Sequence, residues 1–454
     1  MKTWQHLILG AGMTGLAAGY VSGLPIYEAA DVPGGICASY YLKPGTNERL
    51  FTLPDDGEAY RFEIGGGHWI FGGDAAVRQF INRLILLKDY LRTSSVYFSN
   101  DGLYAPYPLQ NHLRYLGVHV AAQALAEMAR PQGSFRTMRE WLEACFGPTL
   151  CQRFFFPFHE RYTAGLYTTI APQDAYKSPV DLSLAIQGAL QEVAAAAKRN
   201  FAVQGEKAAK RKFRATAGYN ATFRYPYSDL STLARSMAQH CTIHYGKRAI
   251  QIDVHEKIVF FADGTEMPYN TIISTLPLNT MLTMTDIQLE TPADPFTSVL
   301  VLNIGAIKGR QCPQDHWLYI PDARSRFHRV GLYSNVDPSF LPKSRQIRND
   351  RISLYIERAY SGGVKPTDHD MQQYIQNVVA ELQKWQFIEE VEVCDPTWVE
   401  AAYTWAYPGS CWKDDALQAL EKYGIYQVGR YGRWQFQGIA DSIRDGFIVG
   451  ASLK

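Results

Sequence analysis

The sequence predicts an α/β fold with two or three packed lobes, and three observations lead to this prediction. A glycine-rich turn joins a short buried strand to a helix-forming run within the first 21 residues. Apolar residues then recur at helical spacing over much of residues 75–200, and strand-like runs dominate beyond residue 240. With 454 residues, of which 46% are hydrophobic, the chain is long enough to bury a substantial core.

The composition argues against several classes of partner. The 45 basic and 44 acidic residues give a net charge of +1, so no overall field attracts nucleic acid or an anionic membrane. The seven scattered cysteines lack CxxC spacing, so we expect neither a disulfide framework nor a metal site. No apolar run approaches the about 20 residues of a membrane helix, and no signal-peptide pattern is present. We therefore expect a soluble, cytoplasmic protein.

The first motif is the glycine-rich turn that follows the strand expected over residues 4–9. Gly10, Gly12 and Gly15 permit a tight turn and allow the N-terminus of the next helix to approach a pyrophosphate. Glu28 ends the following strand, where a carboxylate can accept hydrogen bonds from ribose hydroxyls. This arrangement is typical of a Rossmann-type dinucleotide-binding domain.

Two further glycine-rich segments indicate that the dinucleotide is FAD. One lies a few residues after Glu28 and resembles the extension that separates FAD-binding chains from simple NAD-binding ones. The other lies near the C-terminus and resembles the last FAD contact of such chains, in which strand-end glycines and a helix N-terminus reach the ribityl chain and the pyrophosphate. The additional cofactor contacts expected from these segments are Gly34, Gly35, Gly429, Arg430, Gly438 and Ile439.

Periodicity and turn residues assign the remaining elements in chain order. Helices are expected over residues 77–91, 113–128 and 182–197, where apolar residues recur every three to four positions. Strands are expected over residues 60–64, 250–254, 258–262, 271–275, 298–304, 317–320, 330–333 and 352–357. A basic segment from Lys207 to Arg214 is interpreted as a solvated face in preference to an anion-binding surface.

The motifs are spread along the chain, so the lobes are expected to interleave. The FAD-binding domain would comprise residues 1–75, 215–290 and 420–454. An inserted helical lobe would comprise residues 76–214, and a second, sheet-based substrate lobe would comprise residues 291–419.

Seven short motifs carry a more specific resemblance. They are Gly66 to Phe71, Pro106 to Asn111, Thr222 to Pro226, Trp317 to Tyr319, Phe327 to Asn335, Tyr407-Pro408 and Gly429 to Trp434. Together they resemble the UDP-galactopyranose mutases, especially the eukaryotic type, within the wider group of amine-oxidase-like and protoporphyrinogen-oxidase-like flavoproteins. The resemblance covers nearly the whole chain.

The resemblance implies roles for residues beside the flavin and the base of a nucleotide. Gly67 and His68 would lie against the isoalloxazine ring, with the backbone of this segment near flavin N5. Tyr107 and Gln110 would hold a uracil ring by stacking and hydrogen bonding. A buried, backbone-satisfied histidine and an ordinary core tyrosine are the structural alternatives.

The resemblance also implies a diphosphate site made by Tyr319, Arg329 and Tyr407. A planar guanidinium suits bidentate contact with phosphate, although a structural salt bridge is the alternative for Arg329. His68 and Arg329 are the expected catalytic residues.

The sequence departs from the mutases at the substrate and not at the FAD. Phe156 replaces a second diphosphate-binding arginine, Phe436 replaces a tyrosine, and Ala440 replaces a carboxylate or amide. A glycine-rich run is replaced by residues 227–230, where Asp229 would repel a phosphate. Two neighbouring arginines could supply the lost charge, namely Arg153 and Arg161.

Three functions remain open at this stage. The first is a mutase-like isomerase acting on a small nucleotide sugar, in which reduced flavin N5 attacks the anomeric carbon, the nucleotide diphosphate leaves and the sugar recloses with another ring size. The second is an oxidoreductase that removes a hydride from an amine or alcohol lacking a diphosphate. The third is a flavin-binding scaffold without catalytic activity. The sequence does not indicate an oligomeric state.

Overall fold

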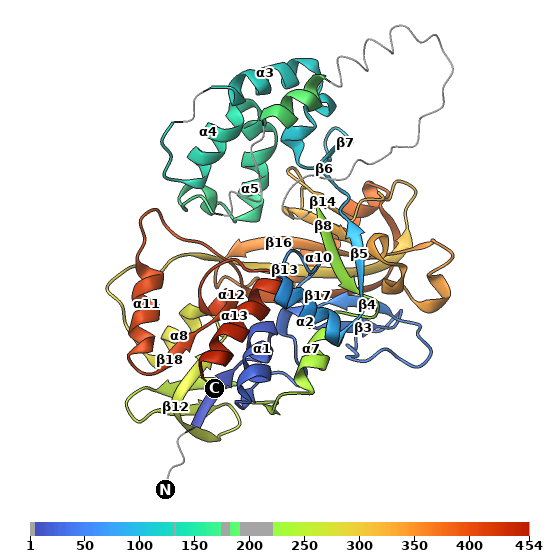
Figure 1. The fold of residues 1–454 in the computed structure, drawn as a ribbon. Helices are drawn as coiled ribbons and strands as arrows, with labels where there is room; N and C mark the ends of the chain where they lie inside the picture. Colours follow the sequence, from blue (N-terminus) through green and yellow to red (C-terminus); the bar gives the residue numbers. More distant parts are fainter. Residues whose placement is uncertain (1–4, 131–132, 174–181, 191–220, 454) are drawn as a thin grey trace, which may run out of the picture. The chain divides into compact units, whose positions relative to one another are not determined.

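The computed structural model describes residues 5–130, 133–173, 182–190 and 221–453, which form two compact units (Figure 1). The first unit contains Met1–Tyr90, Phe223–Ser298 and Val399–Lys454, and the second contains Leu91–Thr222 and Val299–Trp398. The basic segment from Lys207 to Arg214 lies outside the described residues. Residues 182–190 of the third expected helix are helical, and its remainder is also outside them.

A mostly parallel sheet forms the centre of the first unit. Strand β1 pairs in parallel with β12 and β2, and the parallel pairing continues from β12 to β18 and from β2 to β9. Strands β10 and β11 add an antiparallel extension beside β12. The strands are β1 (Gln5–Leu9), β2 (Ile26–Tyr27), β9 (Ile243–His244), β10 (Ala249–Asp253), β11 (Ile258–Phe261), β12 (Glu266–Ser274) and β18 (Ile425–Gln427). This is the Rossmann-type arrangement that the opening motif predicts.

Helices α1 (Met13–Ser22) and α13 (Ile439–Ser452) lie side by side in the first unit, one blue and one red in Figure 1. Glycine allows this close approach. A Cβ atom added to Gly446 would lie 2.3 Å from the Thr14 carbonyl oxygen, and one added to Gly450 would lie 2.6 Å from the Ala18 carbonyl oxygen. The last helix of the chain is therefore packed on the first at backbone distance.

Shorter elements complete the first unit. The two-stranded sheets pair β3 with β4 and β5 with β8. The strands are β3 (Ser39–Leu42), β4 (Tyr60–Glu63), β5 (Leu87–Leu91) and β8 (Thr222–Pro226). The helices are α2 (Ala75–Leu84), α7 (Ser231–Ala238), α8 (Leu278–Thr285), α11 (Trp412–Glu421) and α12 (Gly429–Gly432).

A second seven-stranded sheet, ordered β17-β13-β16-β15-β14-β6-β7, forms the base of the second unit. Its buried apolar side chains pack with those of α10, including Val378 and Leu382, both 0% exposed. The elements are β6 (Ser94–Phe98), β7 (Leu103–Pro106), β13 (Phe296–Lys308), β14 (Trp317–Tyr319), β15 (Arg329–Leu332), β16 (Arg351–Ser361), α10 (Asp368–Lys384) and β17 (Ile388–Thr404).

The second unit also contains a helical region. It includes α3 (Val118–Met128) and the nearly continuous run α4 (Met138–Leu150), η4 (Cys151–Phe155) and α5 (Phe156–Tyr162). This run is irregular because Gly147 takes a φ of 73° and Pro148 follows it, and because η4 is a π-helix. The α/β fold class, with separate sheets and a helical region, is confirmed.

One expectation about secondary structure was wrong. The helix expected over residues 77–91 ends with α2 at Leu84, and β5, β6 and β7 follow it where a mostly helical segment was expected. The physical reason is long-range pairing: β6 pairs in parallel with β14, more than 200 residues further along the chain. Local periodicity carries no signal of such a partner.

The predicted helical and sheet-based lobes fall largely within the same compact unit, the second. Their separation from each other, and the three-part division of the chain, stay predictions.

Candidate functional site

The turn between β1 and α1 uses its three glycines in different ways. Gly10 has a φ of 96°, and a Cβ atom there would lie 2.3 Å from Thr275 Oγ1. A Cβ atom on Gly15 would lie 1.9 Å from the Gly10 carbonyl oxygen. A Cβ atom on Gly12 would meet nothing within 4 Å. Gly10 and Gly15 are thus required by the fold, whereas Gly12 borders open space.

That open space lies at the N-terminus of α1 and suits an anion. Gly12 is the N-cap residue, so no side chain caps the helix, and the first turn contains no acidic residue. The second glycine pair lies beside it, since Gly34 N–H donates to the Ala11 carbonyl over 2.9 Å and a Cβ atom on Gly35 would lie 3.7 Å from Gly12 Cα. The residues present therefore fit a pyrophosphate held by helix-end N–H groups.

Glu28 is fixed at the end of β2 by backbone donors. Its Oε2 accepts from Ala11 N–H over 2.6 Å and its Oε1 accepts from Ala30 N–H over 2.8 Å. A carboxylate has about four acceptor sites, so these bonds orient Glu28 and still leave lone pairs for ribose hydroxyls.

The C-terminal motif approaches the same turn. Gly429 has a φ of 75°, and a Cβ atom there would lie 2.5 Å from Thr14 Oγ1 on α1. Gly438 is the N-cap of α13, and Ile439, its first residue, is buried. The Arg430 guanidinium donates to the Ala402 carbonyl over 2.8 Å, so it braces the backbone here. A direct contact of Arg430 with FAD stays a prediction.

The segment expected beside the flavin ring is a tight turn after β4. Gly66 N–H donates to the Glu63 carbonyl over 3.2 Å, and His68 Nδ1 lies 3.0 Å from the Gly66 carbonyl oxygen. Because a carbonyl can only accept, Nδ1 is the protonated nitrogen and Nε2 is left as an acceptor in the neutral ring. Gly67, between them, is half-buried.

Glu63, which no sequence motif distinguishes, anchors this turn from a fully buried position. Its Oε2 accepts from Ser39 Oγ over 2.8 Å, and its Oε1 accepts from the Tyr225 hydroxyl. Burial raises the pKa of the Glu63 carboxyl from its ordinary 4.5 to about 8. The carboxyl therefore joins β3, β4 and β8 mainly in its protonated form at neutral pH.

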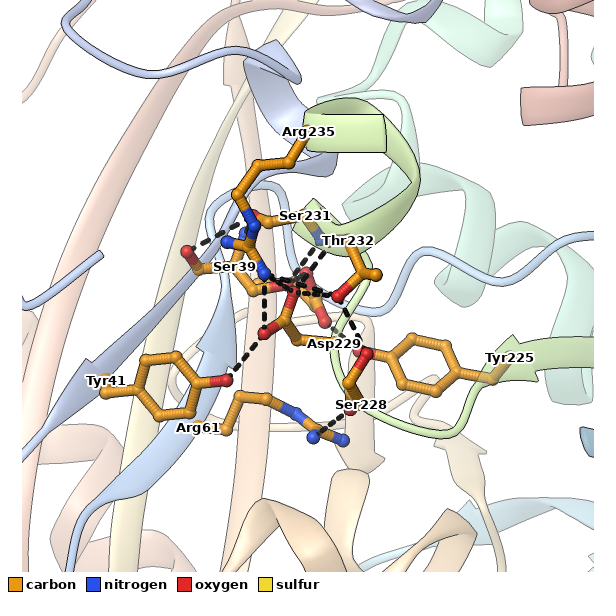
Figure 2. Close-up of polar contacts among 10 residues, drawn as sticks. Ser39, Tyr41, Arg61, Tyr225, Ser228, Asp229, Ser231, Thr232 and Arg235 are labelled. Atoms are coloured by element: carbon orange, nitrogen blue, oxygen red, sulfur yellow. Dashed lines mark hydrogen bonds and ion pairs between the residues drawn. The ribbon is translucent and has the colours of Figure 1, made fainter. Parts of the chain in front are cut away.

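The network reaches α7 through a hydrogen bond from Ser39 N–H to Ser231 Oγ over 2.6 Å, and Figure 2 shows a second polar cluster beside it, around Asp229, which is only 5% exposed. The Asp229 carboxylate accepts from the Tyr41 hydroxyl over 2.7 Å, from Thr232 N–H over 2.9 Å and from the Arg235 guanidinium over 2.8 Å. Sequence analysis expected this carboxylate to repel a phosphate. The structure instead balances its charge with Arg235 and uses it to cap the first turn of α7.

In the second unit, three of the four predicted substrate residues are in contact. The Tyr107 and Tyr319 ring centroids are 4.3 Å apart, and the Arg329 guanidinium lies 5.7 Å from the centroid of the Tyr319 ring. Gln110, 1% exposed, lies just after the cis peptide bond between Tyr107 and Pro108. The structure thus brings Tyr107, Tyr319 and Arg329 together.

Arg329 has a partner that sequence analysis missed. Its Nη1 lies 3.3 Å from Glu357 Oε1, and Glu357 is 4% exposed. Glu357 also lies 3.4 Å from the buried His328, the pKa of which is lowered by desolvation. Glu357 lies within the ordinary strand pattern of β16, and no motif distinguishes it. The structural salt bridge and the diphosphate role are compatible, because a guanidinium has five N–H donors.

The remaining predicted residues lie in the first unit. Tyr407 is 39% exposed, and its N–H donates to Asp294 Oδ1 over 3.0 Å. The Phe436 ring stacks on Arg430, with the guanidinium 4.6 Å from the ring centroid, and Ala440 is buried. Phe436 and Ala440 are therefore apolar at two positions where the UDP-galactopyranose mutases have polar side chains.

The parallel sheet, the uncapped helix N-terminus, the acidic residue at the end of β2 and the second glycine pair define a dinucleotide-binding flavoprotein. The chain belongs to the family of flavin containing amine oxidoreductases, whose family model matches residues 17–449. FAD is its cofactor, as the sequence predicts, and the chain is an FAD-dependent enzyme, an isomerase or an oxidoreductase. The non-catalytic alternative is set aside.

Several solved structures are similar over nearly the whole chain. A crystal structure of reduced UDP-galactopyranose mutase is 22% identical, with a TM-score of 0.77 over 99% of this chain and 95% of that chain. A CLA-producing fatty acid isomerase from P. acnes is 14% identical, with a TM-score of 0.55 over 99% and 98%. A putrescine oxidase bound to putrescine is 14% identical, with a TM-score of 0.54 over 100% and 99%. The predicted resemblance in fold is confirmed.

A comparison with curated protein sequences found no significant match. Among the described residues, no helix is both long and apolar enough to cross a bilayer. No group of three or more His, Cys, Asp or Glu side chains in that part of the chain is arranged to hold a metal ion.

Proposed function

We propose that this enzyme is a mutase-like isomerase that acts on a nucleotide sugar. The observation that carries the proposal is that Tyr319 contacts both Tyr107, from the first segment of the second unit, and Arg329, its partner on the neighbouring strand β15. Two aromatic rings in contact, with a guanidinium over one of them, combine a stacking surface for a base with a cation for phosphate. This combination suits a nucleoside diphosphate better than a simple amine.

Each residue has a distinct task in this proposal. Tyr107 stacks on the base, and buried Gln110 hydrogen bonds to its edge. Arg329 holds the diphosphate and is oriented by its ion pair with Glu357, which restrains the guanidinium before the substrate arrives. The diphosphate is also the leaving group, so a fixed cation there stabilises the charge that develops as the glycosidic bond breaks.

The first unit would supply the flavin and its surroundings. Bound FAD, when reduced, supplies a nucleophilic N5 for the anomeric carbon. The turn from Gly66 to His68 would hold the ring, and the hydrogen bond from His68 Nδ1 to the Gly66 carbonyl keeps the imidazole oriented. The neutral His68 ring can then accept a proton only at Nε2.

The second candidate is an oxidoreductase that removes a hydride from an amine or alcohol. It is favoured by the apolar groups at Phe156, Phe436 and Ala440, which replace three polar substrate contacts of the mutases. A substrate without a diphosphate would lose nothing from these replacements.

Binding and turnover by the purified FAD-containing protein distinguish the two functions. Oxidised and dithionite-reduced protein would be titrated with UDP, UDP-sugars and free amines or sugars, followed by flavin absorbance and tryptophan fluorescence. The mutase proposal expects UDP-sugar binding and anaerobic ring-size isomerisation only after reduction. Flavin reduction by an amine or alcohol, with no response to UDP-sugars, would overturn it in favour of the oxidoreductase.

A further inference from the structure

Phe156, the position at which the mutases place an arginine, lies at an irregular point of the helical region. It begins α5 directly after the π-helical segment η4, and the kink at Gly147 lies earlier in the same run. π-helical turns are rare and are frequently found at functional sites. The local geometry therefore marks the surroundings of Phe156 although its side chain is apolar.

An arginine from α4 lies against this phenylalanine. The guanidinium carbon of Arg139 is 4.3 Å from the centroid of the Phe156 ring, and Arg139 Nη1 donates to the Tyr167 hydroxyl over 3.4 Å. Tyr167 is itself 5% exposed, and its ring centroid is 5.8 Å from that of Phe156. The guanidinium is therefore held by an aromatic face and a buried hydroxyl, while the residue as a whole remains exposed.

The other arginines near this site have partners that fix them. Arg153 forms an ion pair with Asp101, and Arg161 Nη1 donates to the Pro157 carbonyl over 2.8 Å. Arg329 pairs with Glu357. Within the described parts of the chain, Arg139 contacts no carboxylate. Neither Arg153 nor Arg161, the two candidates from the sequence, lies on Phe156 in this way.

The same helix links Arg139 to the aromatic contacts of the predicted diphosphate site. The Phe158 ring, two residues after Phe156 on α5, lies 5.6 Å from the Tyr319 ring. Tyr319 in turn lies under Arg329. Helix α5 thus supplies both the ring that Arg139 lies on, Phe156, and a ring that contacts Tyr319, Phe158.

We propose that Arg139 supplies the second diphosphate-binding cation, in place of the arginine that the mutases carry at the position of Phe156. This inference rests on the proposed function. Stacking on Phe156 restrains the planar guanidinium and leaves N–H donors at its edge for phosphate oxygens. The charge lost at one position of α5 is restored from α4, so the diphosphate site retains two cations.

The test compares UDP with uridine, which has the same base and ribose but no phosphate. In the FAD-containing, reduced protein, Arg139→Ala is expected to weaken UDP binding at least about tenfold and to leave uridine binding unchanged. Arg153→Ala is the matched control, because it removes an arginine that is already paired, and it should alter neither affinity. FAD content and Tm establish that each variant is folded.

A double variant tests the replacement directly. Arg139→Ala combined with Phe156→Arg should regain most of the UDP affinity that Arg139→Ala loses, since the cation is moved back to α5. Phe156→Arg alone should gain little, because two guanidinium groups would then repel each other before UDP binds.

Two results would count against the inference in different ways. If the wild-type protein binds UDP more tightly than uridine but Arg139→Ala keeps the same ratio of affinities, Arg139 has no role and the proposed function stands. If the wild-type protein does not discriminate UDP from uridine, the proposed function itself fails, and the role of Arg139 fails with it.

Discussion

At the scale of single residues, Gly12 and Gly15 are three positions apart, but a side chain added at each should have a different effect on folding and FAD binding. Gly12→Leu should fold, because Gly12 has an ordinary φ of −70° and its Cβ would meet no atom of the chain within 4 Å. The leucine should instead occupy the space at the N-terminus of α1 and lower FAD affinity at least about tenfold. Flavin absorbance per purified chain and near-UV circular dichroism would measure the two effects.

Gly15→Ala provides the contrast for this prediction. Its methyl group would lie 1.9 Å from the Gly10 carbonyl oxygen, so the variant should lose both the fold of the turn and FAD. A folded Gly12→Leu protein that retains full flavin content would contradict the placement of the pyrophosphate.

Glu63 predicts a pH dependence of stability. Its pKa is raised from 4.5 to about 8 in the folded chain, so between these values the folded state holds a proton that the unfolded state releases. The free energy of unfolding should then fall as pH rises through this window, by up to about 1.4 kcal/mol per pH unit for the one proton. Glu63→Gln cannot ionise, and its Tm relative to wild type should rise between pH 5 and pH 8.

The measurement is thermal denaturation of FAD-saturated wild-type and Glu63→Gln protein at half-unit steps of pH. Gln retains the acceptor oxygen facing the Tyr225 hydroxyl, so the hydrogen-bonded network is preserved as far as one substitution allows. Parallel Tm curves for the two proteins would show that Glu63 is ionised in the folded state.

At the scale of elements, the contact between α1 and α13 predicts the effect of a larger residue. Gly446→Val should separate the two helices, because a Cβ atom there would lie 2.3 Å from the Thr14 carbonyl oxygen and 2.6 Å from Ala17 Cβ. Overpacking of this kind typically costs about 1 to 3 kcal/mol. We expect a lower Tm, together with weaker FAD binding because α1 carries the pyrophosphate-binding end.

A matched substitution on the exposed side of α13, Ile448→Val, should change neither property, since Ile448 is 62% exposed. A Gly446→Val protein with unchanged Tm would imply that α13 can shift without cost, contrary to its close packing on α1.

The secondary-structure elements that the sequence predicted well are those whose signals lie within a short stretch of the chain. The β1 turn and α1 were predicted because the glycine spacing, the apolar strand and the helix-forming run all lie within 22 residues. The strands beyond residue 240 were predicted because turn residues bound each apolar run. Strands β5 and β6 were missed because β5 pairs with β8 and β6 with β14, both far along the chain, and β7 was missed with them because it pairs with β6. A pairing with residues 317–319 leaves no trace in the sequence around residue 94.

The same distinction applies to the candidate site. Motifs identified Tyr107, Tyr319 and Arg329, and in the structure Tyr319 contacts both of the other two. The partners Glu357 and Arg139 could not be predicted, because an ion pair or a stacked cation depends on which strand or helix packs alongside. The roles of all these residues toward a ligand remain predictions.

At the scale of the whole molecule, the predicted residues divide between the two units. The expected FAD contacts, His68 and Tyr407 lie in the first unit, whereas Tyr107, Gln110, Tyr319 and Arg329 lie in the second. Substitutions in the second unit should therefore affect the substrate without releasing the cofactor.

Arg329→Ala tests this division. We expect full FAD content but UDP affinity at least about tenfold lower, because a charge-assisted contact is lost. The variant also leaves Glu357 without its arginine, so Arg329→Ala combined with Glu357→Gln separates that loss of stability from the loss of binding. Loss of FAD from the stable double variant would contradict the division.

The close packing of α13 on α1 has a consequence during protein synthesis. Helix α1 ends at Ser22 and α13 begins at Ile439, so translation must proceed through more than 400 residues before the two can meet. Ribosomes add about 5 to 20 residues per second, so α1 emerges roughly 20 to 80 s earlier than its partner. Until then the side of α1 that α13 covers, which includes Ala17 and Ala18, is exposed, and β12 has no β18 beside it. FAD should therefore be captured by the released polypeptide and not by the nascent chain.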